Sequence, residues 1–210
     1  RKDGRVSSQC QRSLESLIKI SDAGEDWRVD PILRKACKPV VDKVCRDTEG
    51  GEARVMSCLM ENIGNNVMLP DCEQALLLIQ YFVVRDFKLD PQLYKQCRDD
   101  AILYCRAKHE WDDVNDAQMD PERGPLILPC LHRIAYSDEK NVKLKQGCFK
   151  EVKRVMRQRA ISVDLIPEVE DYCIDDLALF CYDRTKKGDE MECLQNNLEK
   201  LQSECQVFNE

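Results

Sequence analysis

The chain has 210 residues, of which 43% are hydrophobic and 6% aromatic, and its formal net charge is −7. An acidic balance of this size disfavours general binding to nucleic acid. No apolar run reaches the roughly 18 residues of a membrane span, and no signal peptide begins at Arg1, so we expect any membrane anchor to lie outside these residues.

Thirteen cysteines recur in a fixed order along the chain. Three pairs have seven residues between their partners, a Cys-Leu step follows each pair, and a fourth cysteine closes each set. The sets are Cys37, Cys45, Cys58 and Cys72; Cys97, Cys105, Cys130 and Cys148; and Cys173, Cys181, Cys193 and Cys205. Zinc sites favour closer Cys or His pairs, so we expect disulfides of an oxidising compartment and neither a metal nor another cofactor.

The first predicted segment, residues 1–29, is the tail of a preceding repeat, because Cys10 fits the closing position of a set. Helices are expected to begin at the Asp-Pro steps 30–31 and 90–91, since Asp caps free backbone N–H groups and proline loses no needed donor at the first helical position. Ile166-Pro167 begins a looser third copy without the Asp. These starts predict repeats over residues 30–89, 90–165 and 166–210.

Apolar residues at helical spacing follow each start. Further helices are expected from Cys72 to Phe87, from Cys148 to Ala160 and around the three Cys-Leu steps, whereas the alternation typical of strands is nearly absent. We therefore predict an all-α fold of tandem disulfide-stapled helical repeats that form an elongated array, with about three helices in each repeat.

Residues 108–125 interrupt the second repeat with an acidic stretch rich in turn-forming residues. This composition indicates an exposed loop. Two interpretations remain open: a contact site centred on Trp111, or a solvated insertion without a partner.

The seven-residue gap limits how the cysteines can pair. Two residues eight positions apart on one helix are separated by about 12 Å of rise, whereas a disulfide needs Cα atoms within roughly 7 Å. We favour a nested scheme that bonds second to third and first to fourth, because an antiparallel neighbour would place its start beside the second cysteine. A chained scheme, with bonds such as Cys10–Cys45 and Cys72–Cys105, stays open. The nested scheme leaves Cys10 over, and we expect its partner in a preceding repeat.

A basic stripe runs against the acidic average. Lys150, Lys153, Arg154 and Arg157 recur at i, i+3, i+4 and i+7 after Cys148, which places them on one side of a helix. Such a patch would suit a sulfated glycan or another anionic partner. The alternative is a solvated face whose charges meet neighbouring acidic residues.

Motifs for catalysis are absent. There is no Cys-x-x-Cys, no Gly-x-Ser-x-Gly and no phosphate-binding loop. In the acidic pairs 99–100 and 175–176, adjacent side chains diverge by about 100° on a helix, so we expect a solvated face or a complement to the helix dipole. His109 and His132 have no nearby nucleophile in the sequence. The chain is therefore expected not to be an enzyme.

The order of helix start, Cys-x7-Cys, Cys-Leu and closing cysteine resembles the cysteine-rich repeat of the cysteine-rich fibroblast growth factor receptor family. Residues 97–105 and 173–181 match its signature best, whereas Lys38-Pro39 departs from it. The resemblance implies a large membrane glycoprotein of the secretory pathway, mainly Golgi and also cell surface, with a lumenal array of these repeats. It also implies binding of fibroblast growth factors and transforming growth factor β precursor, and E-selectin recognition through glycans.

Two functional hypotheses follow. The first is a segment that binds secreted proteins, and the second is a structural spacer that sets reach while binding occurs in other repeats. No Asn-x-Ser/Thr sequence is present, so E-selectin recognition through N-linked glycans is not expected on these residues.

Overall fold

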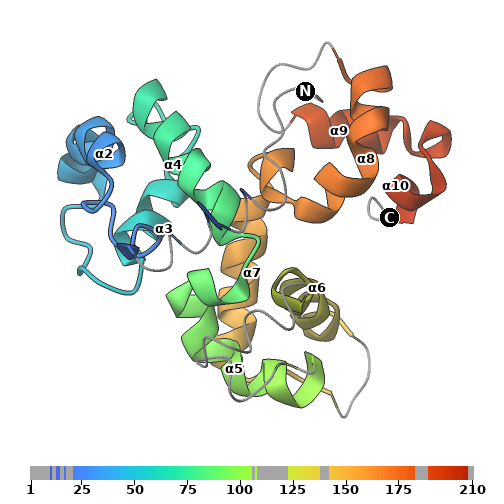
Figure 1. The fold of residues 1–210 in the computed structure, drawn as a ribbon, viewed down its shortest axis with the longest axis horizontal. Helices are drawn as coiled ribbons and strands as arrows, with labels where there is room; N and C mark the ends of the chain where they lie inside the picture. Colours follow the sequence, from blue (N-terminus) through green and yellow to red (C-terminus); the bar gives the residue numbers. More distant parts are fainter. Residues whose placement is uncertain are drawn as a thin grey trace. The chain divides into compact units, whose positions relative to one another are not determined.

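The computed structural model describes residues 10, 13–14, 17, 21–105, 107, 123–137, 142–182 and 189–207. In these ranges every regular element is a helix (Figure 1). The predicted all-α class with disulfide-stapled repeats is thus confirmed. The chain divides into two compact units, Arg1–Val152 and Lys153–Glu210, and the boundary falls within a single helix, α7.

The first repeat contains α2 (Pro31–Val44), α3 (Arg54–Glu61) and α4 (Pro70–Val83). Asp30 begins α2 as predicted, because its Oδ1 accepts a hydrogen bond from the backbone N–H of Leu33 at 2.7 Å. Helix α2 packs against both α3 and α4. The apolar arc of α2 faces these two helices, and its polar side is exposed.

The helix predicted from Cys72 to Phe87 ends earlier than expected. Helix α4 stops at Val83, and the short 3-10 helix η2 (Phe87–Leu89) follows. Asp86 begins η2 by accepting a hydrogen bond from the backbone N–H of Lys88 at 2.9 Å. This local side-chain contact competes with a continued α-helix, which a purely apolar pattern cannot reveal.

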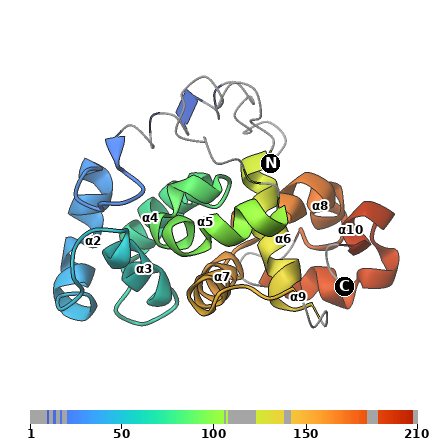
Figure 2. The same cartoon turned by 90° about the horizontal axis from the view of Figure 1, so that it is seen from below.

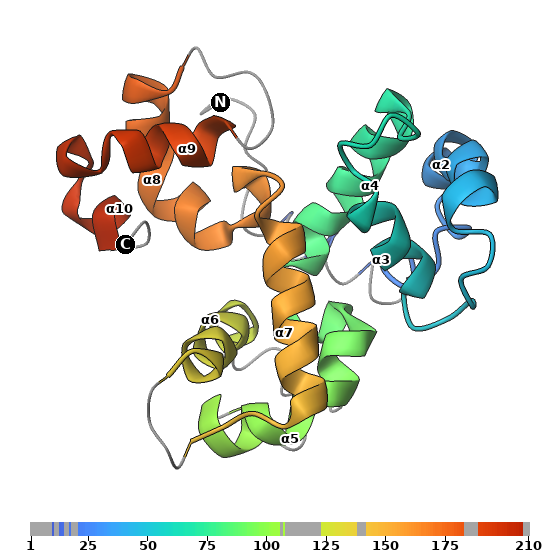
Figure 3. The ribbon, with the colours of Figure 1, turned by 180° about the vertical axis from the view of Figure 1, so that it is seen from behind.

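The second repeat contains α5 (Pro91–Cys105) and α6 (Arg123–Ala135), which pack together, followed by α7 (Gln146–Arg159). Figure 3 shows α7 as one continuous helix. The predicted loop 108–125 is wrong at its end, because α6 already begins at Arg123 and proline is tolerated in a first helical turn. Residues 108–122, including Trp111, lie outside the described residues.

The third repeat contains α8 (Pro167–Phe180), α9 (Asp189–Asn196) and α10 (Ser203–Val207). The 3-10 helices η4 (Val163–Leu165) and η5 (Leu198–Lys200) precede α8 and α10. Helix α8 packs against α9 and α10 (Figure 2) around a buried core. No side chain caps α8 at Ile166, in keeping with the missing Asp.

The predicted repeat boundaries fall before α2, directly after η2 and directly after η4. These boundaries and the elongated form of the array stay predictions. Among the described helices, none combines the length and the apolar character that crossing a bilayer requires.

Candidate functional site

Six disulfides form the frame of the three repeats, and they follow the nested order. The first-to-fourth bonds are Cys37–Cys72, Cys97–Cys148 and Cys173–Cys205. The second-to-third bonds are Cys45–Cys58, Cys105–Cys130 and Cys181–Cys193. Each Cys-x7-Cys helix is therefore bonded at two points to two different elements. The remaining cysteine, Cys10, is exposed, and a partner for it in a preceding repeat stays a prediction.

The two kinds of disulfide differ in burial. All six cysteines of the first-to-fourth bonds are fully buried, with 0% exposure. Their Cα atoms lie 4.6 to 4.9 Å apart, compared with 5.8 to 6.0 Å in the second-to-third bonds. Cys58, Cys105 and Cys130 are only half-buried. The first-to-fourth bonds thus lie in the core, where they fix the inward sides of α2, α5 and α8.

Two buried aspartates add a second link inside the repeats. Asp100 Oδ2 accepts a hydrogen bond from the backbone N–H of Lys145 at 2.8 Å, directly before α7. Asp176 Oδ2 accepts one from the backbone N–H of Gln202 at 3.0 Å, directly before α10. Their exposed fractions are 3% and 2%. The expectation of a solvated face is thus wrong for these two residues, which satisfy free backbone donors at a helix start.

The first repeat lacks this link. Val40 stands three residues after Cys37, where the other repeats have Asp100 and Asp176, and it is buried. Sequence comparison among the repeats shows the Asp in two of three copies, but only the structure shows that it reaches a backbone N–H group across the repeat.

Helices α2, α5 and α8 differ in charge on equivalent disulfide frames. Helix α2 has four basic residues and one acidic residue, α5 has two of each, and α8 has five acidic residues and no basic one. Asp100 of α5 and Asp176 of α8 are buried, whereas the four basic residues of α2 are exposed. The three helices therefore offer three chemically distinct surfaces to a partner.

Helix α8 combines its acidic character with exposed apolar side chains. Tyr172, Asp175 and Leu179 follow one another at i, i+3 and i+7, which places them on one side of the helix, and all three are exposed. Leu179 has an exposed fraction of 65%. We call these three residues the α8 face. Leu103 holds the place of Leu179 on α5 and is 70% exposed.

The basic stripe predicted on α7 does not form a single surface. Lys150, Lys153 and Arg157 are exposed, but Arg154 is buried with an exposed fraction of 7%. Its Nη1 donates a hydrogen bond to Oε1 of Gln158 at 3.0 Å. Gln158 lies one turn after Arg154 on the same side of α7, and it is buried as well. The prediction is wrong for Arg154 because the buried side of the helix is wide enough to include both residues.

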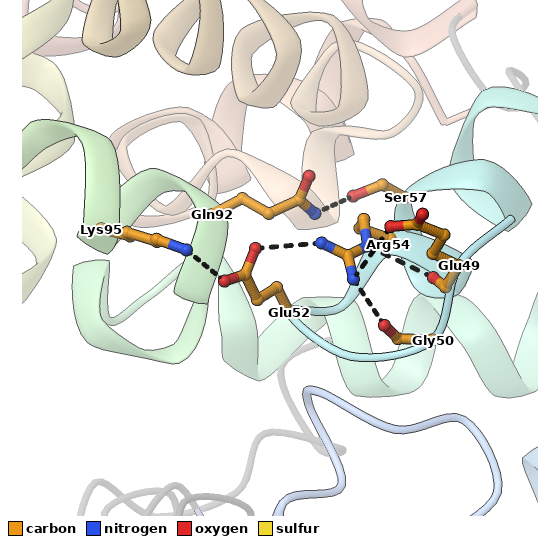
Figure 4. Close-up of polar contacts among 7 residues, drawn as sticks. All are labelled: Glu49, Gly50, Glu52, Arg54, Ser57, Gln92 and Lys95. Carbon is orange, nitrogen blue, oxygen red and sulfur yellow. Dashed lines mark hydrogen bonds and ion pairs between the residues drawn. The ribbon is translucent and has the colours of Figure 1, made fainter.

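A polar network joins the loop before α3 to α5 (Figure 4). Glu52 accepts hydrogen bonds from Lys95 Nζ and from Arg54 Nη1, the latter at 3.2 Å. Gln92 Nε2 donates to Ser57 Oγ at 2.9 Å. The network therefore ties the first repeat to the second within one compact unit.

The loop that presents Glu52 has an unusual backbone. Gly51, Glu52 and Ala53 have φ angles of 84°, 50° and 53°, and the left-handed region is costly for residues other than glycine. The hydrogen bond from Lys95 lowers the pKa of Glu52, and the positive charge of Lys95 acts in the same direction. This ion pair contributes stability above the usual pKa of glutamate and loses it as the pH falls through the lowered value.

Within the described residues, no three His, Cys, Asp or Glu side chains gather as a metal site would require. The geometry is instead that of a stapled helical frame with exposed, chemically distinct helix surfaces.

The frame and its cysteine order define the class: the chain belongs to the cysteine-rich repeat family. The sequence profile of that family, Cys_rich_FGFR, matches residues 8–67, 70–139 and 146–202. Among curated proteins, the chain is similar to Golgi apparatus protein 1 of Homo sapiens and of Mus musculus, each 39% identical over 203 residues. It is also similar to the Golgi apparatus protein 1 homolog of Caenorhabditis elegans, 36% identical over 195 residues.

These alignments cover 96%, 96% and 93% of this chain but only 17% of each relative. The chain thus spans about a sixth of the length of the curated relatives it matches. No solved structure matches it.

Proposed function

We propose that the chain is a non-catalytic protein-binding segment of a membrane glycoprotein of the secretory pathway, on the lumenal side of the Golgi membrane. The name of its relatives, Golgi apparatus protein 1, supports the compartment. The six disulfides agree with an oxidising lumen. The membrane anchor in this proposal lies outside the 210 residues.

The proposed partners are secreted proteins such as fibroblast growth factors, and transforming growth factor β precursor is a second candidate of the same class. The observation that carries this proposal is the α8 face, which places exposed Tyr172 and Leu179 beside Asp175 on a helix without basic residues. Exposed tyrosine and leucine suit the centre of an interface, and the exposed carboxylate of Asp175 between them can attract and orient a basic group of the ligand.

Binding of a basic fibroblast growth factor to the immobilised 210-residue chain tests the proposal, measured by surface plasmon resonance. Leu179→Arg places a large positive group in the α8 face, and we expect the affinity to fall roughly tenfold or more. Leu103→Arg makes the same change at the equivalent, equally exposed position of α5 and should leave the affinity within about twofold. Equal losses in both variants, or none in either, would contradict a site on α8.

The second candidate function is a structural spacer, favoured by the disulfide frame itself. In that case the 210-residue chain shows no measurable binding, whereas a longer array that contains these repeats binds the same growth factor. Binding by the 210-residue chain alone would exclude a pure spacer.

A further inference from the structure

Helix α2 presents four exposed cations that the basic stripe of the sequence did not include. Arg34, Lys35, Lys38 and Lys43 are all exposed, and we call them the α2 cationic face. The opposite side of the helix carries the buried residues Leu33, Cys37, Val40 and Val41. Because this apolar arc is packed into the repeat and held by the Cys37–Cys72 disulfide, the four cations are held on the outward side.

Carboxylates do little to neutralise this face. Lys38 forms an ion pair with Asp42 at 2.9 Å, between two well-exposed side chains. Across the described ranges of the chain, Arg34, Lys35 and Lys43 have no ion pair. The face therefore keeps a local positive charge on a chain whose formal net charge is −7, and it can attract an anion locally.

The cations also stand where they do not help the helix. No acidic residue occupies the first turn of α2. Arg34 and Lys35 lie close to the N-terminus of the helix, where the helix dipole disfavours positive charge. Arg34 and Lys38 form a like-charged i, i+4 pair, which is unfavourable as well. The equivalent helix α8 has no basic residue. The frame thus does not require cations at this place, and a bound polyanion would relieve their repulsion.

We propose that the α2 cationic face binds a sulfated glycan. A disulfide-bonded protein lies on the side of the membrane that is separated from nucleic acids and from the anionic cytoplasmic leaflet. The cations extend over about 13 Å of helix, so they match repeated sulfates along a chain better than one isolated anion. Arginine and lysine both form charge-assisted hydrogen bonds with such oxyanions. This site is separate from the α8 face and does not depend on the proposed growth-factor binding.

The test uses the 210-residue chain and a heparin-derived oligosaccharide at physiological salt. The triple variant Arg34→Gln, Lys35→Gln, Lys43→Gln should bind roughly tenfold more weakly, because each exposed charge pair contributes modestly. A matched control removes the same charge from α7 through Lys150→Gln, Lys153→Gln and Arg157→Gln, all at exposed positions. The affinity of this control for the oligosaccharide should stay within about twofold of that of the parent chain. An unchanged disulfide map in both variants shows that they fold.

Three further probes make the result decisive. Lys35→Arg with Lys43→Arg keeps the charges and should keep the binding. Desulfated heparin should bind much more weakly than heparin, and polyglutamate should not compete. Equal binding of polyglutamate would point to an acidic protein instead. An equal loss in the α7 variant, or no binding by the parent chain at physiological salt, would also overturn the proposal.

Discussion

At the scale of single residues, Asp100 and Asp176 carry a share of stability that their sequence context hides. Each is buried, and each accepts a hydrogen bond from the backbone N–H directly before the helix that holds the closing cysteine. The neighbouring Asp99 instead forms an exposed ion pair with Lys145. Two adjacent aspartates of the same pair thus have different roles, one in the core and one at the surface.

Removing the buried acceptor should be costly. Asp100→Ala or Asp176→Ala leaves the backbone N–H of Lys145 or Gln202 without its charged acceptor, and we expect a loss of about 1–3 kcal/mol in the free energy of unfolding. Asp100→Asn keeps an acceptor oxygen and should lose less. Asp99→Ala is the control, with an expected loss of less than about 1 kcal/mol. Denaturant unfolding of the oxidised chain measures these values, and a loss for Asp99→Ala as large as that for Asp100→Ala would contradict the assignment.

Residue patterns predicted some of these features and missed others. Asp30 and Asp90 cap α2 and α5 as the Asp-Pro steps predict, because capping depends on residues three positions apart. The burial of Arg154 could not be predicted, since it depends on which side of α7 is covered by residues distant in sequence. The same holds for Asp100, whose donor lies at Lys145. The sequence alone shows that α2 contains four basic residues. Only the structure shows that, within the described ranges, Arg34, Lys35 and Lys43 form no ion pair.

At the scale of elements, the disulfides between helices should differ in how easily they are reduced. Cys105 and Cys130 are both half-buried, whereas both cysteines of each first-to-fourth bond are fully buried. Thiol–disulfide exchange requires access of the attacking thiolate to a sulfur atom. The covalent links between α2 and α4, between α5 and α7 and between α8 and α10 are thus the most protected.

Limited reduction of the native chain, followed by alkylation and peptide mass spectrometry, tests this order. We expect Cys105–Cys130 to be reduced first and Cys45–Cys58 next, since Cys58 is also half-buried. The three first-to-fourth bonds should persist until denaturant is added. Early loss of Cys37–Cys72 or Cys173–Cys205 in the native chain would contradict the burial argument.

At the scale of the whole molecule, the segments matched by the family profile do not coincide with the segments closed by the disulfides. Cys37 lies in the segment 8–67 and Cys72 in the segment 70–139, so their bond joins one matched segment to the next. Cys97–Cys148 joins the second segment to the third in the same way. Cys205 lies beyond residue 202, where the third match ends. The unit of sequence repetition is therefore not the unit closed by covalent bonds.

Two fragments of nearly equal length should behave differently for this reason. Residues 153–210 contain a compact unit with its own core and both disulfides, and disulfides of this kind contribute about 3–4 kcal/mol each. We expect this fragment to resist proteolysis and to contain no reactive thiol. Residues 146–202 omit Cys205 and Cys97, so Cys173 and Cys148 both lack their native partners and should be open to alkylation. Equal protease resistance of the two oxidised fragments would contradict the covalent unit defined here.

The buried first-to-fourth bonds also determine how the chain would respond to a pulling force. Tension applied at its two ends would pass through Cys37–Cys72, Cys97–Cys148 and Cys173–Cys205, which bypass sequence separations of 35, 51 and 32 residues. Even with every helix unravelled, these loops would add no length while the bonds remain. Reduction of Cys97–Cys148 alone would release roughly 90 Å at about 3.3–3.6 Å per extended residue, because the intact Cys105–Cys130 bond still bypasses 25 of the 51 residues. The maximum length of the chain is thus controlled by its redox state.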